Sequence, residues 1–558
     1  MSSAADGNRQ RVAVVTGGGG GIGAAIAEAL GRAGTFVVTM DPLVSLDGSE
    51  PLPTPQETTA GRITAAGGSA RASSVSVTDA EAVRRLFEEL ADEFGGLDAV
   101  VNVAGITRPT GFAKGTEEDW LEVLAVHLDG YRNILGAALP IMATAGHGRV
   151  LGVTSGSGWR PADTGAYGCA KRAVASLTWQ LGRLAPPGVV VNAMSPIAVT
   201  RMVTAALGRM PSGGGGGSRS SATGGLSLGS MPTPDQLGPL GAHLVDDDFS
   251  WCRGQVIFAG GSEVAVIDEP RLLEVVRSEP VTSLPHLLEA VTIGAFAPAE
   301  ANQASNGGSN PRFGSVFDEP AAGDVPSTVV QSCTVVTDRP GLASAVTAAL
   351  EARGVACSTV QAGDLALGFR GAADALASIV ERHGPLDGIV VALEGGPSAT
   401  GSMGDWERVL AEHAGIVEHV HADAGWARAA ADYAVRVDVP VRLVTLTDAT
   451  TAGGRSRAQA SAQLARAARR ATGDRVSAFA VSIEVPEAGV VQSISELAAH
   501  LLCSPETPAL SGAELVAGPG WFGLRSHPRP AGSITFGGPD IPEWFDPTLQ
   551  SIIGEGER

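Results

Sequence analysis

The sequence contains little cysteine, almost no lysine and few aromatic residues. Its 558 residues include five cysteines and three tyrosines, aromatic side chains make up 4%, and the only lysines are Lys114 and Lys171. The cysteines are scattered and form no C-x-x-C pair, which argues against a metal site and a disulfide framework and fits free thiols in a reducing cytoplasm. No apolar run approaches the ~18 residues of a membrane helix, and the start of the chain has no signal-peptide core.

The charge balance is acidic. The 39 basic and 59 acidic residues give a formal net charge of −20 at pH 7. Such a charge repels nucleic acids and anionic lipid surfaces. A hydrophobic content of 44% is typical of globular proteins, and the length predicts several domains. We therefore expect a cytoplasmic multidomain protein that binds neither nucleic acid nor membrane.

Short β-rich runs alternate with amphipathic stretches in the first half of the chain. Strands that alternate with helices favour a parallel sheet covered on both faces. The predicted strands cover residues 11–16, 35–40, 97–103 and 149–154, and the predicted helices cover residues 22–33, 80–94 and 117–142.

The second half repeats this pattern in weakened form. Three matches in the same order indicate an internal duplication rather than coincidence. We predict an α/β protein of two tandem Rossmann-like, doubly wound parallel-sheet domains, of which the second is degenerate. The matched segments are 12–16 with 333–337, 119–127 with 405–413, and 254–260 with 512–518.

Composition suggests the domain boundaries. A stretch around 204–232 is rich in glycine and serine, interrupts the first copy, and is expected to be a mobile lid over a substrate rather than a linker. Residues rich in Ala, Asn, Gly, Ser and Pro separate the copies. The predicted organisation is a tail (1–10), a first domain (11–296), a flexible linker (297–326), a second domain (327–535) and a C-terminal tail (536–558).

A glycine-rich turn, Thr16–Gly23, joins the first predicted strand to the first helix. Glycine lets the backbone turn tightly and approach a ligand, and a helix N-terminus favours a pyrophosphate. Asp41 ends the next strand, where a carboxylate can accept hydrogen bonds from adenosine ribose hydroxyls. No basic residue lies within the turn or directly after Asp41 to pair with a 2′-phosphate, so NAD is favoured over NADP. The alternatives are a merely flexible turn and a cap before Pro42.

Tyr167 and Lys171 lie four residues apart on a predicted helix and therefore share one face. Because the chain has so few tyrosines and lysines, an accidental pairing is disfavoured. An ammonium group near a phenol lowers the phenol pKa from its usual value near 10. Ser155, twelve residues before Tyr167, could hydrogen-bond a substrate oxygen while Tyr167 exchanges its proton.

These segments, together with Asn102–Gly105, resemble the signature of the short-chain dehydrogenase/reductase family over residues 10–268. The resemblance implies NAD(P)-dependent hydride transfer between a secondary alcohol and a ketone in the first domain. It implies that Tyr167 is the acid/base, that Ser155 holds the substrate oxygen, and that Lys171 holds the nicotinamide ribose. The implied cofactor-binding residues are Thr16, Gly17, Gly21, Ile22, Gly23, Asp41, Asn102, Ala104, Gly105, Tyr167, Lys171, Pro196 and Thr200.

The sequence departs from the family pattern at several positions. His127 stands where many members carry a helix asparagine that supports a proton relay, and the branch similar to the dehydrogenase unit of peroxisomal multifunctional β-oxidation enzymes has a comparable histidine. This imidazole could relay protons in catalysis or could be a structural group bonded to a backbone carbonyl. Trp159 and Arg160 follow Ser155 in the loop that lines substrate pockets in the family. Arg160 could attract a carboxylate or phosphate, or could be a plain surface arginine.

The second copy lacks the groups that carry this chemistry. Its glycine turn is replaced by residues 338–341 (DRPG), in which an acid opposes a pyrophosphate and a proline removes a backbone donor. Val391 stands where Asn102 does, and the copy has no lysine. We expect it to bind no nucleotide. Since family members pair through two long helices beside the active site, we expect it to pack on the first copy as an intramolecular dimer partner. An independent binding domain is the alternative, and further homo-oligomerisation stays open.

Together these features favour an NAD-preferring dehydrogenase that acts on a hydrophobic secondary alcohol or ketone, such as a 3-hydroxyacyl-CoA or a steroid-like substrate. One alternative is an NADPH-dependent 3-oxoacyl or polyketide-type ketoreductase, against which Asp41 argues. The other is a non-catalytic dinucleotide-binding scaffold. The joint presence of Ser155, Tyr167 and Lys171 argues against a scaffold, which needs none of them.

Overall fold

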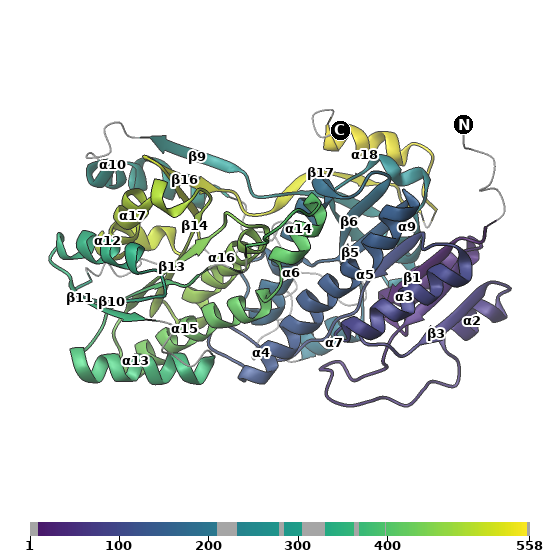
Figure 1. Cartoon of the computed structure of the whole chain (residues 1–558), viewed down its shortest axis with the longest axis horizontal. Coiled ribbons are helices and arrows are strands. Elements are labelled where there is room, and N and C mark those ends of the chain that lie inside the picture. The colour runs from purple at the N-terminus through teal and green to yellow at the C-terminus, as the bar shows by residue number, and fades with distance from the viewer. Residues whose placement is uncertain are drawn as a thin grey trace, which may run out of the picture.

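The two halves of the chain form two α/β units that lie side by side (Figure 1). The computed structural model describes residues 9–208, 231–277, 284–303, 330–361, 368–394, 396, 398–538 and 540–554. Within these residues, no helix is both long and apolar enough to cross a membrane. Most of the expected lid and most of the expected linker lie outside the described residues.

The first half is built on a nine-stranded sheet in the order β17-β8-β7-β6-β5-β4-β1-β2-β3. Strands β1 to β7 are parallel, and β8 and β17 extend the sheet in antiparallel fashion. The central strands are continuous apolar runs because helices cover both faces. The strands are β1 (Val12–Thr16), β2 (Phe36–Met40), β3 (Ser69–Ser73), β4 (Ala99–Asn102), β5 (Gly148–Val153), β6 (Val189–Pro196), β7 (Val256–Gly260), β8 (Glu263–Asp268) and β17 (Arg529–Thr535).

Helices α3, α5 and α6 pack on one face of this sheet, and α1, α9 and α18 pack on the other. The helix predicted over 117–142 begins as α4 (Glu117–Leu124), passes through a π-helical turn, η1 (Ala125–Asp129), and continues as α5 (Gly130–Ala145). The remaining helices are α1 (Gly21–Arg32), α2 (Thr59–Ala65), α3 (Ala80–Phe94), η2 (Gly156–Gly158), α6 (Gly165–Leu184), α7 (Arg201–Gly208), η4 (Pro234–Leu237), α9 (Gly238–His243), η5 (Asp248–Trp251) and α18 (Phe545–Ile553).

The second half is built on an eight-stranded sheet in the order β11-β10-β12-β13-β14-β15-β16-β9. Its parallel strands follow the same path as β2-β1-β4-β5-β6-β7 of the first half, and a strand equivalent to β3 is missing from the described residues. The predicted fold of two tandem Rossmann-like units is therefore confirmed. The strands are β9 (Leu272–Arg277), β10 (Ser332–Thr337), β11 (Ala356–Gln361), β12 (Gly388–Ala392), β13 (Val441–Asp448), β14 (Val476–Ile483), β15 (Glu514–Gly518) and β16 (Trp521–Arg525).

Helices α13, α15 and α16 of the second half belong to the same hydrophobic core as α4, α5 and α6 of the first, whereas α10, α12 and α17 cover the opposite face of the second sheet. The helices are α10 (Leu284–Val291), η7 (Thr292–Phe296), α11 (Ala297–Ala301), α12 (Pro340–Glu351), α13 (Phe369–His383), α14 (Asp405–Glu412), α15 (Ile416–Val437), α16 (Ala452–Thr472), η10 (Glu487–Gly489), α17 (Val491–Cys503) and η11 (Thr507–Leu510).

The long helices α6 and α16 lie side by side at the centre of the molecule (Figure 1). Arg172 on α6 is fully buried and donates to Glu514 Oε2 (2.5 Å) and to Gln459 Oε1 (2.9 Å). Gln180, near the other end of α6, donates to Ser456 Oγ (3.2 Å). A buried charge is strongly unfavourable without its partner, and Glu514 lies on β15, so the Arg172–Glu514 pair fixes how α6 is aligned with the second half.

Two extended segments pass from one sheet to the other. Residues 263–277 form β8 in the first sheet and then β9 in the second, and residues 521–535 run the opposite way as β16 and then β17. Between the sheets, Ser526 N donates to Arg271 O (2.8 Å) and Arg271 N donates to Ser526 Oγ (3.1 Å). The segments thus form one antiparallel ribbon that joins the two halves.

This ribbon makes the boundaries expected from the sequence differ from the observed ones. Strand β9, expected in the first domain (11–296), pairs in the second sheet, and β17, expected in the second domain (327–535), pairs in the first. Helix α18, expected in a C-terminal tail, buries Phe545 and Leu549 against the first half. Helix α11 occupies the start of the expected linker. A strand sequence does not reveal which sheet will accept it, so this exchange could not be inferred from composition.

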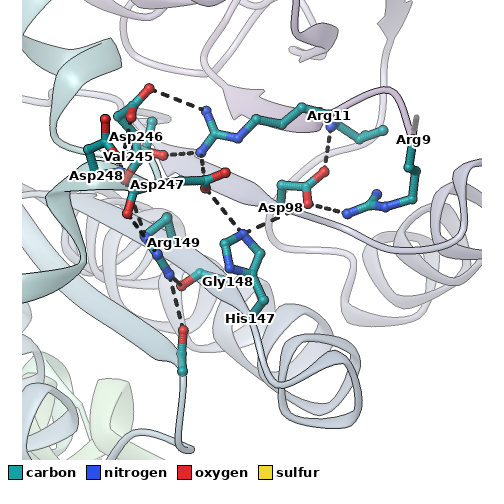
Figure 2. A network of polar contacts seen from close by, with 12 residues as sticks. Arg9, Arg11, Asp98, His147, Gly148, Arg149, Val245, Asp246, Asp247 and Asp248 are labelled. Carbon is teal, nitrogen blue, oxygen red and sulfur yellow. Dashed lines mark hydrogen bonds and ion pairs between the residues drawn. The ribbon is translucent and has the colours of Figure 1, made fainter. Parts of the chain in front are cut away.

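A charged network ties together the amino ends of the strands in the first sheet (Figure 2). Asp98, buried directly before β4, accepts a hydrogen bond from Arg9. His147 Nε2 lies 3.9 Å from Asp98 Oδ1 and 3.2 Å from Asp247 Oδ1. Arg149 Nη2 donates to the carbonyl oxygen of Asp247 (3.2 Å). The network lies at the end of the sheet opposite to the carboxyl ends of the strands, so it stabilises the fold.

Candidate functional site

The carboxyl ends of β1, β4 and β5 carry most of the predicted site residues. At the end of β1, Thr16 Oγ1 donates to Asn102 Oδ1 (2.8 Å) and accepts from Ala104 N (3.0 Å). Gly17, with φ of +65°, packs against this group, and a Cβ atom there would lie 3.0 Å from Ala104 N. Thr16 therefore joins the glycine turn to the segment that follows β4.

The glycine turn presents an open surface at the start of α1. A Cβ atom on Gly23 would lie 2.3 Å from Gly17 O, so the turn closes only around glycine. Gly21, with φ of +54°, has no atom within 4 Å of its Cβ position, and Ile22 beside it is half-buried. No side chain caps the helix N-terminus, whose backbone N–H groups favour an anion. These features fit the pyrophosphate of a dinucleotide.

Asp41 lies directly against this turn. Its Oδ2 accepts from Gly19 N (3.0 Å) and its Oδ1 accepts from Leu43 N (2.8 Å). Leu43 adopts a φ of +54°, a left-handed conformation that is unfavourable for leucine. The two hydrogen bonds hold the carboxylate at the edge of the open surface, where it can still accept from a ligand hydroxyl.

One basic residue near the turn is not among the residues expected to bind the cofactor. Arg201, in the first turn of α7, places a guanidinium nitrogen 3.8 Å from the Cβ position of Gly20. The two positions are far apart in the chain, and only the fold brings them together. Arg201 supplies a positive charge beside the surface that fits a pyrophosphate.

Ser155, Tyr167 and Lys171 lie close together after β5. Ser155 follows β5, and its hydroxyl group hydrogen-bonds Tyr167 in the first turn of α6. Burial raises the pKa of Tyr167, whereas the hydrogen bond from Ser155 and the nearby positive charge of Arg160 lower it. Arg160 is therefore a second cation near Tyr167, and the effect of Lys171 on the phenol stays a prediction.

Lys171 lies one turn further along α6, with Nζ 5.6 Å from the centre of the Tyr167 ring. Its Nζ donates to Val153 O (2.7 Å), which leaves two N–H groups for a ligand. Burial lowers the pKa of Lys171 to about 7. The ammonium is therefore held by a backbone carbonyl in a site that disfavours its charge.

His127 occupies the π-helical turn η1 and packs edge-on against Tyr167, with ring centres 5.2 Å apart. Its Nε2 lies 3.0 Å from Ile106 O, and because a carbonyl only accepts, Nε2 carries the proton. Burial, with a smaller contribution from Lys171, lowers the pKa of His127 well below its usual value. A Cβ on Gly105 would lie 2.5 Å from this ring, so glycine is required there. This geometry is that of the structural alternative, a neutral histidine bonded to the backbone.

The two residues expected to line a substrate pocket lie in different surroundings. Trp159 is only 1% exposed and packs in a core with Trp179 and Phe258, so it belongs to the hydrophobic interior. Arg160 is half-buried and donates to Ser157 Oγ (3.1 Å), so it is not a plain surface arginine. Arg160 lies near enough to Tyr167 to lower the pKa of the phenol.

Pro196 and Thr200 frame the segment that leads from β6 into α7. Pro196 is the last residue of β6, and Thr200 Oγ1 accepts from Val203 N (3.2 Å) at the start of the helix. The backbone between Pro196 and Thr200 is attached to β7, because Ile197 N donates to Ala259 O (2.8 Å). The residues that follow this helix, 209–230, belong to the expected lid and lie outside the described part of the chain.

The corresponding edge of the second sheet is filled by charged side chains. Arg457 is fully buried and forms a two-pronged ion pair with Asp423, with Nε–Oδ2 and Nη2–Oδ1 distances of 2.9 and 2.7 Å. Its Nη1 also donates to Glu394 O (2.6 Å), just after β12. Asp338 and Asp448, at the ends of β10 and β13, help to keep the pKa of Arg457 raised.

The strand register corrects one assignment in the second half. Thr16 pairs with Asn102 between β1 and β4, and Thr337 pairs with Ala392 between β10 and β12. Ala392, and not Val391, therefore stands where Asn102 does. Thr337 Oγ1 donates to the backbone oxygen of Ala392 (2.8 Å), because no side-chain acceptor is present.

Helix alignment shows what replaces the reactive pair. Counted from the first residues of α6 and α16, Tyr167 corresponds to Gly454 and Lys171 to Ala458. A Cβ on Gly454 would lie 2.0 Å from Asp448 O, so the space that a tyrosine would need is closed.

Comparisons with known proteins agree with this architecture. A family model described as short chain dehydrogenase matches residues 11–210. The chain is 31% identical over 257 residues to the short-chain reductase protein NovJ of Streptomyces niveus, a match that covers 46% of this chain and 94% of that protein. It is 34% identical over 196 residues to the peroxisomal hydratase-dehydrogenase-epimerase of Saccharomyces cerevisiae, covering 35% of this chain and 22% of that protein.

A solved structure resembles both halves together. The N-domain of a bacterial malonyl-CoA reductase, determined with NADP, aligns with a TM-score of 0.63 at 16% identity and covers 89% of this chain and 95% of that one. This likeness shows the fold alone.

The fold and the glycine turn define an oxidoreductase of the class that binds a nicotinamide dinucleotide. More narrowly, the match to NovJ and the family model show that this chain belongs to the short-chain dehydrogenase/reductase family.

Proposed function

We propose that this protein catalyses hydride transfer between a nicotinamide dinucleotide, preferably NAD, and a hydrophobic secondary alcohol or ketone, with Tyr167 as the acid/base. The observation that carries the proposal is the convergence of Ser155, Tyr167 and Lys171 on the sheet edge that carries the open glycine turn. A scaffold that only binds a dinucleotide would need the turn and not the three reactive side chains.

The chain's own residues account for the proton transfer. In the direction of oxidation, a nicotinamide dinucleotide held by these residues would supply the acceptor for the hydride that leaves the substrate carbon. Ser155 hydrogen-bonds the substrate oxygen, and the Tyr167 oxygen takes the hydroxyl proton as the carbonyl forms. In the direction of reduction, Tyr167 returns that proton to the carbonyl oxygen. Arg160 favours the phenolate electrostatically, which assists the basic role.

The other site residues hold the nucleotide in this proposal. The two free N–H groups of Lys171 can bind ribose hydroxyls, and the α1 N-terminus with Arg201 can bind the pyrophosphate. The base of the nucleotide site is held in its conformation by Thr16, Asn102, Ala104 and Gly105. The side of the site next to α7 is formed by Pro196 and Thr200. His127 supports Tyr167 by packing and takes no proton step.

Asp41 supports a preference for NAD. Its carboxylate sits against the glycine turn, where it can accept from ribose hydroxyls and would repel a 2′-phosphate. Arg201 favours the alternative, an NADPH-dependent ketoreductase, because it places a positive charge near the same turn. In thermal-shift titrations we expect NADH to stabilise the protein at lower concentration than NADPH, and the reverse order would support the alternative.

The substrate class is proposed from the relatives. Relatives named 3-oxoacyl-[acyl-carrier-protein] reductase and acetoacetyl-CoA reductase support a 3-hydroxyacyl thioester as the first substrate to test, with steroid-like alcohols as the second. All five cysteines are free, which is consistent with the cytoplasmic location that we propose.

Turnover tests the proposal directly. With NADH and a panel of 3-oxoacyl-CoA and steroid ketones, we expect the wild-type protein to oxidise NADH. We expect Tyr167→Phe to reduce kcat by at least about 10³-fold, since the phenol proton has no substitute, while the thermal shift with NADH persists. A fully active Tyr167→Phe variant, or a wild-type protein inert toward the whole panel, would refute the assignment.

We also propose that the second half serves as an intramolecular dimer partner and binds no nucleotide. The α6–α16 contact, the shared core and the ion pair of Arg172 with Glu514 support the first statement. The ion pair of Arg457 with Asp423, which fills the sheet edge, supports the second. Calorimetric titration with NADH should give one site per chain.

A further inference from the structure

The catalytic loop between β5 and α6, residues 154–164, contacts the second half of the molecule. It carries Ser155 and Arg160, the two residues that lower the pKa of Tyr167. Within the loop, Ser157 N donates to Ser155 Oγ (3.3 Å), and Arg160 Nη2 donates to Ser157 Oγ (3.1 Å). The positions of Ser155 and Arg160 therefore both depend on where the backbone at Ser157 lies.

Gln463, on α16 of the second half, holds this backbone. Its side-chain Nε2 donates to Ser157 O (3.1 Å) and to Arg160 O (2.9 Å), and the side chain is only 2% exposed. A primary amide has two N–H donors, and these two carbonyls take both. Gln463 Oε1 is buried and has no partner among the described residues, so the amide is oriented by its bonds to the loop.

The helix opposite Gln463 leaves room for this contact. Gly168, the residue after Tyr167, faces Gln463, and a Cβ there would lie 3.4 Å from Gln463 Cγ and 2.9 Å from Ser157 O. A larger residue at position 168 would push the loop away from α16. The contact therefore depends on one feature from each half.

We propose that Gln463 is a positioning residue for the active site, through which the catalytically empty half holds Ser155 and Arg160 in place beside Tyr167. This inference rests on the proposed function for its kinetic consequence, but the hydrogen bonds that carry it do not. It gives the second half a part in the reaction beyond dimer-like packing.

The groups around Tyr167 determine the pH at which its phenol loses its proton, and this pH can be measured. Besides Ser155 and Arg160, the ring meets His127 from η1, which is neutral, and Lys171 from its own helix. The hydrogen bonds of Gln463 within the described residues go to the loop, so its loss should weaken the effects of Ser155 and Arg160 and leave those of His127 and Lys171. The basic form of Tyr167 should then be reached only at higher pH.

The test uses Gln463→Met in the full-length protein, since methionine keeps the volume and removes both donors. In alcohol oxidation, we expect the acidic limb of the kcat profile to move up by about one pH unit, so that kcat at pH 7 falls about tenfold and recovers at higher pH. The KM for the nucleotide should stay within about twofold, because the glycine turn is untouched. Gln463→Ala should behave in the same way if methionine disturbs packing.

Gln459→Met is the matched control. Gln459 lies one turn earlier on α16, accepts from Arg172 across the same interface and donates to Glu514 of its own half. Within the described residues, neither of these hydrogen bonds reaches the loop. It should lose stability to a similar extent and keep the wild-type pH profile. If Gln463→Met also keeps that profile, or if both variants shift it equally, the positioning role is refuted.

Hydrogen exchange separates this inference from the proposed function. In the absence of any ligand, amides of residues 156–160 should exchange faster in Gln463→Met than in the wild type or in Gln459→Met. Unchanged exchange in Gln463→Met would show that Gln463 does not constrain the loop, whether or not the enzyme turns over. If Gln463→Met exchanges faster but the wild type shows no turnover, the proposed function is overturned and the contact is established.

Discussion

The two halves share a strand order and differ in what stands at the carboxyl ends of the strands. In the first half, glycine backbone and an open helix N-terminus occupy this edge. In the second half, Arg457, Asp423 and Asp338 occupy it. Both sheets nevertheless retain continuous buried strands. The fold thus depends on many apolar contacts, whereas the chemistry depends on a few side chains that can be lost without loss of the fold.

The difference also shows which part of the second half was kept. Helices α15 and α16 bury long alanine-rich faces against the first half, and the Arg172–Glu514 pair lies in that interface. The positions that correspond to Tyr167 and Lys171 are Gly454 and Ala458, small residues that pack closely. A half that no longer needs reactive groups can use these positions for packing.

Breaking the Arg457–Asp423 pair should have the largest effect on stability. Removing one member of a buried ion pair leaves an uncompensated charge, so we expect Arg457→Met to lower the free energy of unfolding by about 3–5 kcal/mol in chemical denaturation. The double variant Arg457→Met/Asp423→Leu should recover most of this loss. Both should still bind one NADH per chain. If either variant bound a second nucleotide, the ion pair would be the only feature that prevents the second half from binding one.

Lys171 offers a smaller effect with a defined pH dependence. Its pKa of about 7 in the folded protein lies below the ~10.4 of an unfolded chain, so between these values the unfolded state binds more protons. The free energy of unfolding of the wild type should therefore rise with pH through this window. Below pH 7 the buried charge is fully unfavourable.

Lys171→Met, which resembles Ala458 of the second half in being uncharged, should accordingly stabilise the ligand-free protein by about 2–4 kcal/mol below pH 7. This gain should vanish above pH 10.4, while turnover is lost at all pH values. Lys114→Met is the control, as it removes the only other lysine, which lies outside the site. A stabilisation that does not change with pH would contradict the burial of the charge.

Substitution of Asp41 should have the smallest effect, a change in nucleotide affinity. Asp41→Asn keeps an acceptor for the backbone at Gly19 or Leu43 but removes the negative charge. We expect the Kd for NADH to rise about tenfold, or ~1.4 kcal/mol, and that for NADPH to fall. Calorimetry with both nucleotides measures the ratio. An unchanged ratio would mean that Asp41 serves only to hold the turn.

Several features of the site could be read from the chain because they are local. The order of strands and helices, the glycine turn and the spacing of Tyr167 and Lys171 all lie within short segments, and helical periodicity places the last two on one face. The electrostatics were harder to infer. Arg160 lies close enough to lower the pKa of Tyr167, and Trp159 next to it is buried in a hydrophobic core, because the direction of loop side chains depends on the surroundings.

The sequence by itself determined that this chain makes two Rossmann-like units, and that only the first carries a Ser-Tyr-Lys set, since both properties follow from residues close together in the chain. Only the tertiary structure decided that the halves exchange β9 and β17, that Arg201 approaches the glycine turn, and that Gln463 holds the catalytic loop. These contacts join residues that lie far apart in the chain, and their partners are selected by packing geometry, which no local pattern of residues encodes.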